Sequence, residues 1–231
     1  MESLASQIAE VAHLIGDSSR AKILSALMHG RALRAFDLAS EANVTPQTAS
    51  GHLAKLLDGK LVTAEKRGRY RFYRLATPLV GQMLQSISMV AALGPPRHSP
   101  PLRGEPQIRQ ARICYDHIAG NLGAAITTAL IDRLHIVLDE DAGGVTEEGH
   151  LFFHTYGILL TRAPAQRVFC RTCLDWSGRG PHLAGRVGAA LCRHFFKNDW
   201  IRRGQAIRAL EITPLGEKAL SDLFGLSLQD L

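Results

Sequence analysis

The chain has 231 residues, of which 46% are hydrophobic and 21% are charged. This balance is typical of a chain that buries a core, and it excludes a mainly disordered protein. There is no apolar run of the roughly 18 residues that a membrane helix needs, and the start of the chain lacks the features of a signal peptide. We therefore expect a cytoplasmic location, where the four cysteines would be thiols or metal ligands rather than disulfides.

Positive charge is concentrated in the first part of the chain. The formal net charge is +6, and residues 1–96 hold 11 basic and 7 acidic side chains. A basic surface of this kind is suited to a polyanionic partner such as nucleic acid.

A proline-rich segment divides the chain. Residues 94–106 contain five prolines, which neither a helix nor a central strand accommodates. We predict a linker here, between an N-terminal domain over residues 1–93 and a C-terminal domain over residues 107–231.

The N-terminal domain is predicted to begin with four helices. Thr45 can cap the fourth of them, because its hydroxyl can accept a backbone hydrogen bond and Pro46 has the backbone angle of a first helical residue. The four helices cover residues 1–15, the segment from Asp17 or Ser18 to His29-Gly30, a short stretch around Phe36 and Leu38, and the segment from Pro46 to Asp58.

A basic hairpin and a further helix are predicted to follow. Residues 61–65 and 70–75 are rich in β-forming residues and flank a glycine turn at Gly68. The last helix covers residues 78–93, with Leu79, Met83, Ile87 and Val90 in register at helical spacing. This order of elements is that of a winged helix-turn-helix. The expected fold class is mainly α with small β-hairpins, an α+β chain.

This arrangement predicts a DNA-binding surface. A helix with small polar side chains fits the major groove, and arginines on a wing can contact phosphates or the minor groove. The candidate base-reading residues are Thr45, Gln47, Thr48, Ser50 and His52, with Thr45 also as cap and phosphate contact. The candidate backbone or minor-groove contacts are Lys55, Arg67, Arg69 and Arg71. The alternative is a solvated helix face and charged hairpin in a protein-binding module.

Several segments of this domain resemble the ArsR/SmtB family of bacterial transcriptional repressors. They are Gly16-Asp17-Ser18-Ser19-Arg20 with Ile23-Leu24, Leu38-Ala39, Ser50-Gly51-His52-Leu53 with Gly59-Lys60-Leu61-Val62, and Gly68-Arg69-Tyr70-Arg71-Phe72-Tyr73-Arg74-Leu75. The resemblance covers about a third of the chain. It implies a homodimer paired through the first and last helices of the domain, operator binding by the helix over 45–58, and release of the DNA by a ligand, metal or oxidant.

The chain departs from the family where its metal-sensing members bind metal. The short third helix contains no cysteine, and residues 78–93 contain no Asp, Glu, His or Cys. Because neither of the family's familiar metal sites can form, we expect any sensing to lie in the C-terminal domain.

The C-terminal domain is predicted to be mostly helical. Apolar spacing predicts a helix of about thirty residues from Ile108 to Leu138, which Gly120 and Gly123 can kink or divide. The other predicted elements are a short helix from Thr146 to Tyr156, a strand around residues 168–170, a helix opened by Pro181, a hairpin over 200–212 and a final helix after Thr213-Pro214. Because residues 181–225 have the element order of 45–93, we expect a second, winged-helix-like unit with a regulatory or dimerising role.

All four cysteines lie in this domain, and three interpretations of them stay open. In the first, zinc or another thiophilic metal is bound by Cys170 and Cys173 with Cys114 or His182, while His117 lies one helical turn from Cys114. In the second, Cys170–Cys173 or Cys114–Cys173 is a redox switch. In the third, the cysteines are buried core residues and there is no cofactor.

An organic effector is a further option. Tyr115, Asp116, Asp175 and Trp176 are the candidate lining residues of its pocket, because an indole can stack on a ring and carboxylates can hold polar groups. In the alternative interpretation, Asp175 caps a turn and Trp176 fills the core.

The sequence thus predicts a sequence-specific DNA-binding regulator, by resemblance a repressor, released by an effector sensed in the C-terminal domain. One alternative is an architectural DNA-binding protein that senses nothing. The other is a hydrolase or oxidoreductase with Cys114 or Cys173 as nucleophile and His117 or His182 as base. The sequence has no Gly-rich phosphate loop, G-x-S-x-G or His-Glu-x-x-His motif to support an enzyme, so we expect none.

Overall fold

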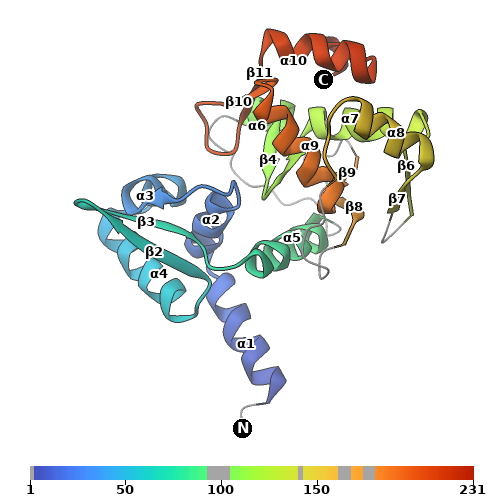
Figure 1. The fold of residues 1–231 in the computed structure, drawn as a ribbon. Coiled ribbons are helices and arrows are strands. Elements are labelled where there is room, and N and C mark those ends of the chain that lie inside the picture. The colour runs from blue at the N-terminus through green and yellow to red at the C-terminus, as the bar shows by residue number, and fades with distance from the viewer. Residues whose placement is uncertain (1–2, 93–104, 140–142, 161–167, 174–179) are drawn as a thin grey trace. The chain divides into compact units, whose positions relative to one another are not determined.

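The computed structural model describes residues 3–92, 105–139, 143–160, 168–173 and 180–231 (Figure 1). The chain divides into two compact units, Met1–Ile87 and Ser88–Leu231. Within the described ranges, no helix is both long and apolar enough to cross a membrane.

The N-terminal unit is a winged helix-turn-helix, as predicted. Its three strands form an antiparallel sheet in the order β1-β3-β2. The elements are α1 (Leu4–Ile15), α2 (Ser18–Leu27), β1 (Leu33–Arg34), α3 (Ala35–Ala42), α4 (Pro46–Asp58), β2 (Val62–Arg67), β3 (Tyr70–Leu75) and α5 (Pro78–Ala92).

Local hydrogen bonds set the helix boundaries of this unit. The Asp17 carboxylate accepts from the Arg20 amide at 2.9 Å, and the Thr45 hydroxyl accepts from the Thr48 amide at 3.2 Å. Both are N-caps that satisfy amides with no partner inside their helix. The buried Arg20 guanidinium donates to the carbonyl oxygens of His13 and Leu14 and so ties the end of α1 to α2.

Two helices of this unit present apolar side chains to solvent. On α1, Leu4 is 72% exposed and Ile8 is 60% exposed. On α5, Leu79 is 72% exposed, whereas Val80 is buried. Among the described residues, an apolar surface on α1 and α5 is therefore uncovered.

In the described part of the C-terminal unit there are three sheets, of two, four and two strands. Its helices are α6 (Glu105–Gln110), α7 (Asn121–Asp132), α8 (Glu147–Thr155), α9 (Gly185–Lys197) and α10 (Pro214–Ala219), which continues as a π-helical turn over Leu220–Phe224. Its strands are β4 (Arg112–Cys114), β5 (His117–Ala119), β6 (Ile136–Leu138), β7 (Gly143–Val145), β8 (Cys170–Cys173), β9 (His182–Ala184), β10 (Ile201–Arg203) and β11 (Leu210–Ile212).

The predicted thirty-residue helix from Ile108 to Leu138 is wrong. The segment forms α6, the β4–β5 hairpin, α7 and β6. Tyr115 and Gly120 have positive φ angles of 62° and 78°, which a right-handed helix does not contain. Hydrogen bonds from the Ile113 amide to Arg208 and from the Leu210 amide to Ala111 hold β4 in an extended form.

The helix predicted from Pro181 is also displaced. Residues 182–184 form β9, which pairs antiparallel with β8, and α9 begins only at Gly185. Gly185 has a φ of 78°, so the chain changes direction there. The register of β9 against β8 thus overrides the helical spacing that begins at Leu183.

The C-terminal unit consists of two similar halves. Each half has the order strand, strand, helix, strand, strand, helix. The first contains Arg112-Ile113-Cys114 and His117-Ile118-Ala119-Gly120-Asn121-Leu122-Gly123-Ala124-Ala125, and the second contains Arg171-Thr172-Cys173 and His182-Leu183-Ala184-Gly185-Arg186-Val187-Gly188-Ala189-Ala190. Residues 185–224 do have the predicted helix–hairpin–helix order. However, the segment whose sequence resembles theirs lies in the first half of this unit and not in residues 45–93.

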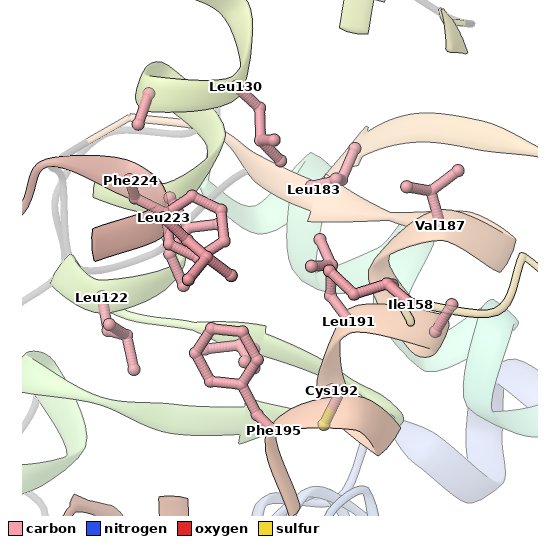
Figure 2. Close-up of a cluster of buried hydrophobic side chains, with 14 of the residues drawn as sticks. Leu122, Leu130, Ile158, Leu183, Val187, Leu191, Cys192, Phe195, Leu223 and Phe224 are labelled. Carbon is pink, nitrogen blue, oxygen red and sulfur yellow. The ribbon is translucent and has the colours of Figure 1, made fainter. Parts of the chain in front are cut away.

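The two halves interlock reciprocally. A Cβ built on Gly123 would lie 3.3 Å from the Cβ of His182, and one on Gly188 would lie 3.2 Å from the Cβ of His117. Reciprocal contacts of this kind are typical of an approximate two-fold relation. The helices of both halves also share one core, in which Leu122 of α7 lies near Phe195 of α9 and near Leu223 (Figure 2).

Candidate functional site

Helix α4 separates a buried apolar face from an exposed polar one. Ala49, Leu53 and Leu56 are fully buried, whereas Gln47 and Lys55 are exposed. Gln47, Thr48 and Lys55 are all exposed, and Thr48 and Lys55 lie two helical turns apart on the same side of the helix. This is the arrangement that a helix needs to present donors to base edges in a major groove.

The other candidate residues of α4 have local partners. The Thr45 and Thr48 hydroxyls lie 2.9 Å apart, and the Ser50 hydroxyl donates to the Pro46 carbonyl at 2.8 Å. His52 differs from them, because its side chain is only 16% exposed and its Nδ1 lies 3.7 Å from Asp17 Oδ1. It faces the start of α2 and is the least accessible of the predicted base-reading residues.

The β2–β3 hairpin forms a basic wing around Gly68, whose φ of 60° suits the turn. The exposed Arg67 forms a bidentate ion pair with Glu65, which raises the pKa of Arg67 and lowers that of Glu65. Arg69 lies over the ring of Tyr70, with Cζ 4.9 Å from the ring centroid. Arg69 and Arg71 are exposed on this wing, while the charge of Arg67 is offset by Glu65.

A cluster of two thiols and two imidazoles lies in the C-terminal unit. Cys114 and His117 face each other across the β4–β5 hairpin, and Cys173 and His182 occupy the same positions on β8 and β9. All four side chains are buried, and each offers a ligand atom within 4.8 Å of the others. The two Nε2 atoms of His117 and His182 are 3.1 Å apart. We call these four residues the Cys/His cluster.

The surroundings of the cluster favour a charged thiol. A hydrogen bond with Cys173, together with His117 and His182, holds the pKa of the Cys114 thiol well below its usual range. Burial lowers the pKa of His117, but Cys114 and the carboxylate of Asp116 outweigh it, so the pKa is raised. Asp116 Oδ1 lies 3.4 Å from His117 Nδ1 and orients this ring.

The other two cysteines lie apart from this cluster. Cys170 and Cys173 are three residues apart on a strand, where alternate side chains point to opposite faces. Cys170 packs into the apolar core, and burial raises its pKa to about 11. Burial likewise raises the pKa of Cys192 to about 12. The structure therefore separates the C-x-x-C pair and does not bring Cys170 to the predicted metal ligands.

The predicted helical adjacency of Cys114 and His117 is wrong, since the two residues meet across a tight turn. Of the candidate effector residues, Tyr115 and Asp116 are half-buried at this turn, while Asp175 and Trp176 lie outside the described residues. A surface cleft of this unit lies between α7 and residues 224–226, and neither Tyr115 nor Asp116 lines it.

All four residues of the Cys/His cluster were candidates from the sequence, but the sequence did not predict that these four, without Cys170, come together. The signal that identifies the set is the repeated His-x-Ala-Gly-x-x-Gly-Ala-Ala motif, beginning at His117 and at His182. Each copy has a cysteine at the end of the preceding strand. Aligning the copies pairs Cys114 with Cys173, and so leaves Cys170 out.

Comparison with known proteins agrees with the N-terminal fold. A helix-turn-helix domain family matches residues 15–65. The uncharacterized HTH-type transcriptional regulator YdfF of Bacillus subtilis (strain 168) is 38% identical over 213 residues, which cover 92% of this chain and 94% of that protein. The arsenical resistance operon repressor of Staphylococcus aureus is 30% identical over 84 residues, 36% of this chain and 80% of that repressor.

Solved structures match the N-terminal part. The homodimeric winged helix-turn-helix DNA-binding domain of a Mycobacterium bovis protein is 28% identical and covers 38% of this chain and 81% of its own, with a TM-score of 0.36. The antimony-specific transcriptional repressor AntR is 25% identical and covers 39% of this chain and 86% of its own, with a TM-score of 0.35. The long match to a transcriptional regulator, together with the winged fold of residues 1–87, shows that the chain belongs to the ArsR-type family of winged helix-turn-helix transcriptional regulators.

Proposed function

We propose that this regulator is a homodimeric repressor that binds a two-fold symmetric operator and releases it when an effector acts on the C-terminal unit. The observation that carries the proposal is the exposed polar face of α4 beside a basic wing. The relatives are transcriptional regulators, and one is named as an operon repressor.

The α4 residues divide into two roles. Gln47 and Thr48 read base edges from the exposed first turn of the helix, with Ser50 beside them and His52 at the margin. Thr45 caps the helix and contacts phosphate. A Gln side chain suits adenine, because its amide can donate and accept at the same base edge.

The remaining contacts are electrostatic. Lys55, Arg69 and Arg71 neutralise phosphates, and Arg67 joins them when its pair with Glu65 opens. Such contacts supply affinity and salt dependence but carry little sequence information.

The apolar surface on α1 and α5 supports the dimer. Leu4, Ile8 and Leu79 are large apolar side chains that stay mostly exposed in one copy of the chain. Covering them with the same helices of a second copy buries this surface, and a two-fold dimer places its two α4 helices one turn of DNA apart.

The Cys/His cluster supports effector control through the C-terminal unit. It is the place where metal-binding and redox-active groups gather among the described residues of this unit, and it joins both halves of it. A thiophilic metal or an oxidant acting there would change the packing between the halves.

The test uses an operator selected by the purified chain from random-sequence DNA. We expect Gln47→Ala to relax specificity at one base pair of each half-site, at a cost of about 1–3 kcal/mol on the preferred operator. We expect Arg69→Ala to weaken binding to all sequences alike. It should also reduce the slope of log K against log salt by about 0.9 for each phosphate that the variant no longer neutralises. The control is Arg202→Ala, an exposed arginine of the C-terminal unit.

Two results would refute the proposal. If Gln47→Ala bound every operator variant as the wild type does, α4 would not read bases. If the wild type bound all DNA sequences equally, and metals and oxidants did not change its affinity for DNA, the protein would be an architectural DNA-binding protein instead.

A further inference from the structure

We infer that the Cys/His cluster is a four-coordinate Cys2His2 site for zinc, to which each half of the C-terminal unit contributes one cysteine and one histidine. Thiolate and imidazole are the ligands that structural zinc sites use. The distances fit this ion. Bond lengths of about 2.0–2.1 Å to nitrogen and about 2.3 Å to sulfur give tetrahedral edges of about 3.3 Å between nitrogens and about 3.8 Å between sulfurs. The two Nε2 atoms are 3.1 Å apart, and all four ligand atoms lie within 4.8 Å of one another.

The duplication argues for the site independently of these distances. Cys114 pairs with His117, and Cys173 pairs with His182, at the same register positions of two equivalent hairpins. Each half therefore supplies the same pair of ligands, and the pairs meet where the halves interlock at Gly123 and Gly188. An ion at this point is held equally by both halves and joins them.

The two buried histidines are better explained by zinc than by a disulfide. A Cys114–Cys173 disulfide would need neither imidazole, whereas the two Nε2 atoms lie 3.1 Å apart, where one ring can donate to the other or both can bind one ion. A divalent cation satisfies both nitrogens, and two thiolates balance its charge in a buried place. Asp116 completes the arrangement, because accepting from His117 Nδ1 leaves Nε2 as the ligand nitrogen.

Burial makes the site a closed one. The four side chains are at most 7% exposed. Four protein ligands with no open position are typical of structural zinc rather than of a catalytic ion. Zinc binding is therefore coupled to the folding of the C-terminal unit. If the proposed function holds, the loss of zinc is also the event that changes operator affinity.

The first measurement is the metal content of the full-length chain, purified without chelator. We expect elemental analysis by inductively coupled plasma mass spectrometry to find one zinc ion per chain. Replacing zinc by Co2+ should give the visible spectrum of a tetrahedral thiolate complex. Cys114→Ala and Cys173→Ala should each lower zinc affinity by more than about tenfold, since even losing an outer-shell partner costs that much. The matched control is Cys192→Ala, which removes a buried thiol outside the cluster and should keep the zinc.

A second measurement uses the wild-type chain, so that the proposal can still be tested if the ligand variants fail to fold. The wild-type chain is melted after chelation and again after zinc is restored, with tryptophan fluorescence as the readout. Both tryptophans, Trp176 and Trp200, belong to the C-terminal unit, so the signal reports this unit alone. We expect zinc to raise its Tm reversibly.

The proposal is overturned if the folded wild-type chain contains no zinc and Co2+ gives no tetrahedral spectrum, or if Cys192→Ala loses the metal as Cys114→Ala does. A Cys114–Cys173 disulfide in the metal-free protein, with operator affinity that follows oxidation, would also overturn it, although effector control would survive. Zinc binding that leaves operator affinity unchanged would support the site and refute effector control at the cluster.

Discussion

Substituting Gly188 by alanine tests how closely α9 packs against β9 of its own half and against His117 of the other half. A Cβ at this position of α9 would lie 2.3 Å from the Leu183 carbonyl oxygen and 3.2 Å from the Cβ of His117. The first contact is far inside van der Waals distance and involves backbone, so β9 and α9 must move apart. Overpacking of this kind costs about 1–3 kcal/mol.

The substitution also has a favourable term. Alanine is about 1 kcal/mol better than glycine inside a helix. Because the clash involves backbone, we place the overpacking cost near the upper end of its range, and we expect a net loss of about 2 kcal/mol in the free energy of unfolding. With a urea m-value of about 2 kcal/mol per molar, the midpoint should fall by about 1 M.

Urea unfolding followed by tryptophan fluorescence measures this loss in the C-terminal unit alone. The control is Gly144→Ala in the same unit, because its Cβ would meet no atom within 4 Å. A Gly188→Ala midpoint equal to that of the wild type, or above it, would refute the close packing of α9 against Leu183 and His117.

The other predictions concern the cluster, the dimer and the N-terminal unit. Asp116→Asn should weaken zinc binding by about 10–100-fold in competition with a chelator, because the carboxylate orients His117, and unchanged affinity would argue against that role. Ile8→Glu should yield monomers with weakened operator binding in analytical ultracentrifugation and gel-shift assays, and a stable dimer would show that α1 lies outside the interface. Arg20→Ala should cost about 2 kcal/mol, because it removes charged donors to two carbonyls at the end of α1, and circular dichroism should show the lower unfolding midpoint. The pKa of Asp17 is lowered, chiefly by the hydrogen bond from the Arg20 amide. The ionised carboxylate therefore stabilises the fold fully above the unfolded pKa near 4, and this stabilisation is lost as the pH falls through the folded pKa. Urea midpoints measured between about pH 5 and 3 should depend less on pH in Asp17→Asn than in the wild type.

The N-terminal unit could be predicted from the sequence because its signals are local. Asp17 and Thr45 cap helices through amides three residues away, and Gly68 forms the turn between two adjacent strands. These interactions act within a few residues and need no partner from elsewhere in the chain. The caps, the basic wing and the polar face of α4 could therefore be predicted before the fold was known.

The side of α5 that packs against the core could not be chosen from the sequence. Its apolar residues have helical spacing on more than one side, and spacing alone does not say which side meets the core. The packing of α5 decided that Val80 is buried and Leu79 exposed. The family resemblance, rather than this spacing, implied that the helix pairs in the dimer.

The members of the C-terminal site, by contrast, depend on pairing between distant parts of the chain. Residues 108–138 have helical spacing, yet Ile113 is held in a strand by a hydrogen bond to Arg208, 95 positions away in the sequence. Pairing over such distances outweighs local propensity, because each buried backbone group must find a partner. The same strand geometry turns Cys170 away from Cys173 and brings Cys173 to His182. The residue types of a thiol–imidazole site could thus be read from the sequence, but the choice of its four members depended on how two hairpins, one from each half, meet in space.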